Sequence, residues 1–146
     1  MSNNLAKNKC LHLGVSAFIV IIVGLSYGIN PNKVLPLLFD FEVESKDLSN
    51  VFRSIMGLYL SLAAYWIFGV IKKEAWKGAT ISNILFMGGL AFGRIISLII
   101  DGIPSNAFLI GLTAEILDLV WGIYNLKTYS IQENSIPVLD TRYPEE

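Results

Sequence analysis

The chain has 146 residues, of which 53% are hydrophobic and only 16% are charged, and its formal net charge is −1. Soluble domains carry about a quarter charged residues. The composition therefore excludes an ordinary soluble enzyme domain and a disordered chain. A nucleic-acid-binding protein is also excluded, because contacts to phosphates demand a basic surface.

The shortage of charge is concentrated in four apolar runs. Only three charged side chains, Arg94, Glu115 and Asp118, lie inside the runs 11–29, 54–71, 79–100 and 107–126. Runs of about 20 apolar residues match the hydrocarbon thickness that a transmembrane helix must cross. The first run is longer than the apolar core of a signal peptide, which spans about 7–15 residues. The sequence therefore predicts an all-α integral membrane protein with four transmembrane helices.

Lysine and arginine positions predict the orientation of these helices. The second helix is expected to begin before its apolar run, which gives spans at about 11–29, 51–71, 79–100 and 107–126. Seven basic residues then lie on one side of the membrane and three on the other. By the positive-inside rule both termini are cytoplasmic. The seven are Lys7, Lys9, Lys72, Lys73, Lys77, Lys127 and Arg142, and the three are Lys33, Lys46 and Arg53.

Short connections at 72–78 and 101–106 favour antiparallel neighbours, so an antiparallel bundle is expected. Residues 1–126 form the membrane domain, and residues 127–146 a polar cytoplasmic tail. The predicted location is a bacterial inner membrane, with the lipid bilayer as the first partner.

The long outer segment at 30–50 has two open interpretations. Residues 39–44 alternate apolar and acidic side chains with a period of two, which suits an extended piece lying on the membrane surface. An ordinary solvated loop fits equally well. Pro31 and Pro36 disfavour a continuous helix here, and Asp47 or Ser49 is expected to cap the helix that follows.

Single cysteine and histidine residues exclude several kinds of site. Cys10 alone cannot form an intrachain disulfide, and His12 alone gives no basis for zinc ligation or a histidine-based triad. His12 is interpreted as an interfacial side chain near the lipid headgroups. The candidate interfacial anchors are Trp66, Trp76, Trp121, Tyr27 and Tyr129, and Trp76 is the clearest of them because it lies among the loop lysines. No catalytic residue, metal site or cofactor is predicted.

Charges inside a bilayer are costly, so each requires a partner or a cavity. Arg94 lies about 10 Å below Asp101 along one helix, and Glu115 lies about 12 Å below Ala107 along the next, at 1.5 Å per residue. The two charges are therefore level with each other, and an Arg94–Glu115 pair is expected.

Five further residues complete the expected polar network. Arg53 and Asp101 are expected to close the outer mouth, with Tyr59 and Ser97 adding hydrogen bonds to the pair. Asp118 lies deeper and is expected to be protonated or bonded to a neighbour such as Tyr65. Alternatively, these polar residues only fix the register between helices.

Two glycine motifs indicate close helix packing. Gly24 and Gly28, and likewise Gly89 and Gly93, are separated by three residues. Small residues at this spacing let transmembrane helices approach closely, but the motif alone does not establish a dimer.

The chain resembles a small bacterial membrane family, domain of unknown function 4345. The resemblance rests on Arg53-x-x-x-Gly57-Leu58-Tyr59-Leu60, on Gly89-Leu90-Ala91-x-Gly93-Arg94-x-x-Ser97 running into Asp101-Gly102-x-Pro104, and on Glu115. It covers nearly the whole chain up to about residue 126. It implies a four-helix membrane protein with polar residues at these positions and no assigned activity. Asp118 has no counterpart in the pattern.

Three functions compete. The favoured one is a non-enzymatic bundle that binds a small ligand or lipid headgroup, for example an anionic group at Arg53 or Arg94, or that serves as an accessory subunit of a membrane complex. The alternative is a small oligomeric proton-coupled transporter using Glu115 or Asp118, with a homo-oligomer as partner. An intramembrane enzyme ranks last, because no nucleophile and base are paired.

Overall fold

The computed structural model describes residues 2–39 and 41–134, and the side chains of residues 9–39 and 41–129. The described part is helical and contains no strand. Its elements are α1 (Ser2–Gly28), α2 (Pro31–Leu38), α3 (Lys46–Ile71), the 3-10 turn η1 (Lys73–Ala75), α4 (Trp76–Ile100) and α5 (Asn106–Asn134). Four segments are long and apolar enough to cross a membrane: Lys9–Gly28, Lys46–Ile71, Lys73–Ile100 and Asn106–Tyr129. The prediction of an all-α protein with four membrane helices is confirmed.

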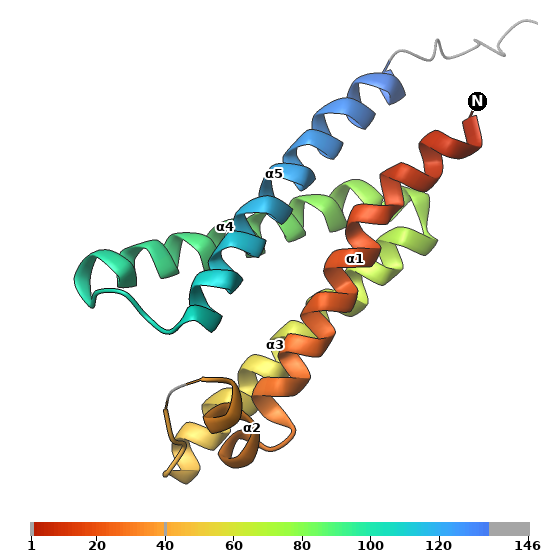
Figure 1. Cartoon of the computed structure of the whole chain (residues 1–146). Helices are drawn as coiled ribbons and strands as arrows, with labels where there is room; N and C mark the ends of the chain where they lie inside the picture. The colour runs from red at the N-terminus through yellow and green to blue at the C-terminus, as the bar shows by residue number, and fades with distance from the viewer. Residues whose placement is uncertain (1, 40, 135–146) are drawn as a thin grey trace, which may run out of the picture.

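The helix pairs differ in how extensively they pack against each other. α1 and α3 lie side by side along most of their length, whereas α4 crosses them at a steep angle and packs mainly against α5 (Figure 1). The short helix α2 lies at the end of α1, beside the start of α3 (Figure 1). α1 and α5 touch over a smaller region. The space between α1, α4 and α5 is therefore less completely filled by helix contacts than the α1–α3 interface.

Local sequence explains where the helices begin. Ser45 is the N-cap of α3, because its hydroxyl accepts a hydrogen bond from the Leu48 amide at 3.0 Å. The prediction that Asp47 or Ser49 caps this helix is wrong, since both residues lie inside it. Ser49 instead donates to Asn32 Oδ1 at 2.8 Å and so ties α3 to α2. Pro31 opens α2 at a position where no amide hydrogen is needed.

The connection between α4 and α5 is short and tightly turned. Residues 101–105 join the two helices, and Gly102 there has a φ of +93°. A residue with a side chain rarely adopts this backbone conformation. The turn therefore keeps the start of α5 next to the end of α4 and fixes their relative depth.

The last helix extends beyond its apolar run into the segment predicted as a tail. Helix α5 continues past residue 126 to Asn134. The residues after 126 contain neither glycine nor proline before Pro137, so nothing in the sequence ends the helix at the edge of the apolar run. The rest of the predicted tail, residues 135–146, lies outside the described residues.

The alternating segment at 39–44 packs against protein. Val43 is only 5% exposed, whereas its neighbours Glu42 and Glu44 are exposed. The alternation in the sequence therefore corresponds to an alternation of buried and exposed side chains. Its apolar side covers helices: the Phe41 ring stacks on Phe52 at 5.8 Å, and the Phe39 ring lies 4.6 Å from Phe108. The apolar side chains of this segment therefore face α3 and α5.

Two tryptophans expected at the headgroups are core residues. Trp66 and Trp76 are buried. The Trp66 indole donates to Ser82 Oγ and the Trp76 indole to the Lys9 carbonyl, each at 3.0 Å. A buried indole N–H needs such a partner. The prediction that these two side chains anchor the protein in the headgroup layer is wrong, because they contact protein on all sides.

The first glycine motif brings α1 onto α3. A Cβ atom on Gly24 would lie 2.9 Å from Tyr59 Cβ, and one on Gly28 would overlap Met56. The motif therefore serves packing within the chain. By contrast, Gly89 and Gly93 have nothing within 4 Å of the position a Cβ would take.

We expect Gly24→Ala to destabilise the protein by about 1–3 kcal/mol. The added methyl group would meet the Cβ atom of Tyr59, whose position is fixed by the backbone of α3. Thermal unfolding of the purified protein in detergent measures this. Gly14→Ala is the matched control on the same helix, since a Cβ there meets nothing within 4 Å. Equal melting temperatures for the two variants would contradict close α1–α3 packing at Gly24.

Candidate functional site

The predicted ion pair between α4 and α5 is confirmed. Arg94 Nε lies 2.9 Å from both carboxylate oxygens of Glu115. The side chains are 21% and 9% exposed respectively. The Arg94 guanidinium also lies 5.2 Å from the centroid of the Phe108 ring and packs next to Gly111. Such a buried pair is tolerated only with close contact, since desolvation opposes it.

The outer mouth expected between Arg53 and Asp101 does not form. Both side chains are exposed, and no ion pair joins them. The steep angle between α3 and α4 carries the end of α4 away from the start of α3 (Figure 1). Equal depth in the membrane was therefore not enough to bring these two residues together.

Ser97 and Tyr59 have roles other than the expected hydrogen bonds to the pair. Ser97 donates to Asp101 Oδ2 at 2.9 Å, one helical turn further on and on the exposed side of α4. Tyr59 is buried, with its ring 5.0 Å from Phe86 and 5.8 Å from Tyr27. Tyr59 faces the same cavity as Arg94, described below.

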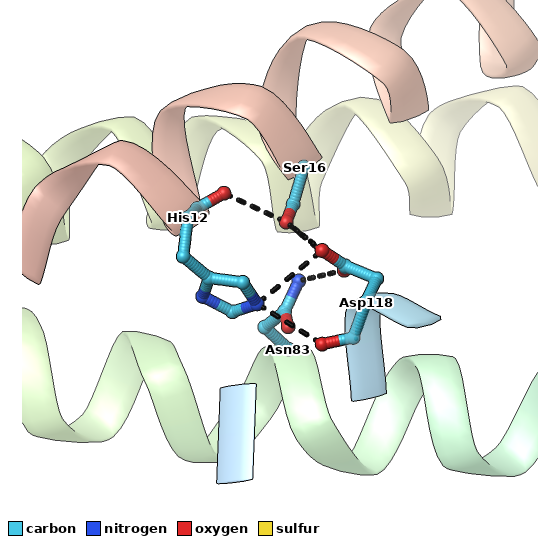
Figure 2. Close-up of polar contacts among 4 residues, drawn as sticks. All are labelled: His12, Ser16, Asn83 and Asp118. Atoms are coloured by element: carbon cyan, nitrogen blue, oxygen red, sulfur yellow. Dashed lines mark hydrogen bonds and ion pairs between the residues drawn. The ribbon is translucent and has the colours of Figure 1, made fainter. Parts of the chain in front are cut away.

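Asp118 lies at the centre of a second polar group, which we call the Asp118 cluster and which comprises His12, Ser16, Asn83 and Asp118 (Figure 2). Ser16 Oγ lies 2.7 and 2.9 Å from the two Asp118 carboxylate oxygens. Asn83 Nδ2 donates to Oδ2 at 3.2 Å, and His12 Nε2 lies 3.3 Å from Oδ1. Three helices, α1, α4 and α5, are thus joined through one carboxylate.

The prediction for His12 is wrong, whereas Asp118 is hydrogen-bonded to neighbours as expected, but not to the one suggested. His12 is fully buried, with its ring 5.2 Å from Trp121 in an edge-on arrangement, so it is not a headgroup-level side chain. The hydrogen bonds of Asp118 go to the cluster and not to Tyr65. Helix α1 begins at residue 2, well before its apolar run. This places His12 inside the helix packing.

A signal for the Asp118 cluster exists in the sequence. His12 and Ser16 are four residues apart and so share one face of a helix. Asn83 is an amide within an apolar run, and polar groups in transmembrane helices bond across to neighbouring helices. The pattern identifies three candidate partners for Asp118, although it does not say which helices meet.

A cavity of about 310 Å³ joins the two polar groups. Its walls come chiefly from α1, α4 and α5 and are mostly apolar. The ionisable side chains on its wall are Arg94, Glu115 and Asp118, together with the tyrosines, and Ser16 adds a hydroxyl. The apolar and aromatic lining is Ile19, Val20, Val23, Tyr27, Phe39, Tyr59, Met87, Leu90, Ala107, Ile110, Gly111 and Ala114. Across the residues that the structure describes, no three His, Cys, Asp or Glu side chains are grouped to hold a metal ion.

These features define a multi-pass membrane protein with four helices that are long and apolar enough to span a membrane, and with a mostly apolar cavity bordered by Arg94, Glu115 and Asp118. Residues 10–124 match the model of the family described as domain of unknown function (DUF4345), and the chain belongs to that family. The family assignment expected from the sequence is confirmed. Comparisons with curated proteins and with solved structures gave no match.

We expect Glu115→Gln to lower the free energy of unfolding by about 2–3 kcal/mol, because it leaves the Arg94 guanidinium without a counter-charge. The loss is below that of a fully buried pair, since Arg94 is 21% exposed. Thermal unfolding in detergent measures it. Arg94→Leu combined with Glu115→Leu should recover most of the loss, because both charges are then removed.

Asp101→Asn is the control for this experiment. It removes an exposed carboxylate that contacts only Ser97 on its own helix, and should change stability by less than about 0.5 kcal/mol. If Glu115→Gln is as stable as Asp101→Asn, the ion pair does not stabilise the α4–α5 contact.

Proposed function

We propose that this protein binds a small amphiphilic molecule in the cavity between α1, α4 and α5. The observation that carries the proposal is the cavity itself: about 310 Å³ of space with an apolar lining and a few convergent polar groups. Ligand sites in proteins have this composition, with volumes of about 300–1,000 Å³. The role is that of a non-enzymatic binding protein.

The position of the charges supports binding over simple helix registration. Charges that only fix register are expected within a closely packed helix interface. Here Arg94, Glu115 and Asp118 all border the cavity. A ligand there would meet mostly apolar side chains from all three helices together with these three charged groups, which suits a molecule with one apolar and one polar part.

Arg53 has no part in this proposal. It is exposed and does not line the cavity. Of the two arginines considered for ligand contact, only Arg94 remains, and Glu115 already neutralises its charge.

We expect benzyl alcohol, a small neutral amphiphile, to bind the purified protein in phosphatidylcholine nanodiscs. Ala114→Phe places a ring in the cavity and should weaken binding by about tenfold or more. Isothermal titration calorimetry measures this, with empty nanodiscs subtracted for partitioning. Val120→Phe is the matched control, because Val120 is exposed on the same helix and does not line the cavity. Equal binding by the two variants would place the ligand outside the cavity.

We also propose that the four spans form an antiparallel bundle with both termini in the cytoplasm of a bacterial cell, in its inner membrane. Support comes from Lys72, Lys73 and Lys77, which cluster at the connection between α3 and α4. The acidic residues Glu42 and Glu44 lie in the connection at the other end of α3. Basic connections stay cytoplasmic during insertion.

Cysteine labelling in intact bacterial cells tests this orientation. In a Cys10→Ala background, Glu44→Cys should react with a membrane-impermeant maleimide, whereas Lys73→Cys should react only after the cells are opened. Both positions are exposed and outside the apolar core of the helices. Labelling of the second variant in intact cells, with none of the first, would reverse the orientation.

A further inference from the structure

The proton positions in the Asp118 cluster determine its charge. His12 Nδ1 is buried and has no hydrogen-bond partner. A protonated imidazole would leave an N–H group there without an acceptor, which costs about 1–3 kcal/mol or more. The neutral ring with its proton on Nε2 leaves only a lone pair unused, and its N–H points to Asp118. The geometry therefore fits a neutral His12.

Asp118 is then surrounded by neutral donors. Ser16 Oγ and Asn83 Nδ2 hydrogen-bond to its carboxylate. His12 Nε2 lies 3.3 Å from Oδ1 and hydrogen-bonds to the Asp118 main-chain carbonyl oxygen, also at 3.3 Å. An ionised carboxylate accepts from both Ser16 and Asn83. Within the described side chains no lysine or arginine contacts Asp118.

The two carboxylates on the cavity wall therefore differ in whether a cation neutralises them. Glu115 is neutralised by Arg94 at 2.9 Å. Asp118 has hydrogen bonds but no cation, and its side chain, which is 14% exposed, borders the cavity together with Ser16. With one positive and two negative groups, the wall carries one formal negative charge in a low-dielectric surrounding. A charge so placed is costly until a cation meets it.

We infer that the Asp118 cluster is the recognition site for an ammonium group, so that the cavity selects small organic amines with an apolar body. Ser16 and Asp118 line the cavity, whereas His12 and Asn83 do not. Both of these contact Asp118 (Figure 2). The ammonium group would contact the Asp118 carboxylate, and the apolar body would lie against α1 residues such as Val20 and Val23. This inference rests on the proposed ligand-binding function and gives its ligand a chemical class.

Three probes with one ring and different head groups test the inference: benzylammonium, benzyl alcohol and benzoate at pH 7. Binding to the full chain in phosphatidylcholine nanodiscs is measured by calorimetry, with empty nanodiscs subtracted. Benzylammonium should bind about tenfold tighter than either of the other two. Asp118→Asn should bring benzylammonium and benzyl alcohol within about twofold of each other. Asp101→Asn removes an exposed carboxylate that does not line the cavity and should keep the preference.

The unmodified chain alone gives a decisive comparison, so the test does not depend on the folding of Asp118→Asn. Tightest binding of benzoate would show that Arg94 dominates the cavity, and equal binding of all three would show a protonated Asp118. Either result overturns the amine site and leaves the proposed cavity function standing. A preference for benzylammonium that survives Asp118→Asn also overturns it. If none of the three binds, both the amine site and the proposed function are wrong.

Discussion

A charge in a bilayer has no water to solvate it, so the protein itself must supply the solvation, and this requirement organises the whole α1–α4–α5 region. Each charged residue within the apolar runs is held by partners on other helices. Arg94 and Glu115 join α4 to α5, and Asp118 joins α5 to both α1 and α4. Lipid does not drive apolar helices together as water does. These polar contacts therefore add directional attractions that the apolar surfaces of the same helices lack.

The two halves of the molecule are held together by different means. α1 and α3 meet through glycines, where Gly24 and Gly28 let the backbones approach Tyr59 and Met56. Their contact depends on shape and dispersion forces. The contact of α5 with the rest depends more on the buried polar residues. The cavity lies on this second side, between α1, α4 and α5.

Sequence reasoning succeeded where the chain itself fixed the geometry. The spans followed from apolar length, and the Arg94–Glu115 pair followed from counting rise along two helices joined by the short turn at 101–105. Counting the rise along each helix did not predict contacts between helices that lack such a short connection. Arg53 and Asp101 share a depth, but the steep crossing of α4 separates them, and nothing in the composition of either helix specifies a crossing angle. The partners of Asp118 were missed for the same reason, because α1 and α5 are far apart in the chain.

Glu115 has a cationic partner and Asp118 does not, and a purely structural role explains this difference least well. The two residues are three positions apart on α5 and border one cavity. Glu115 is paired with a guanidinium, whereas the carboxylate of Asp118 is hydrogen-bonded to the uncharged side chains of Ser16 and Asn83. If polar residues served only to fix register, a neutral side chain at residue 118 would make comparable hydrogen bonds to Ser16 and Asn83 without the cost of a buried charge. A carboxylate there is reasonable when its charge is used, and the cavity beside it is the place where a ligand could use it.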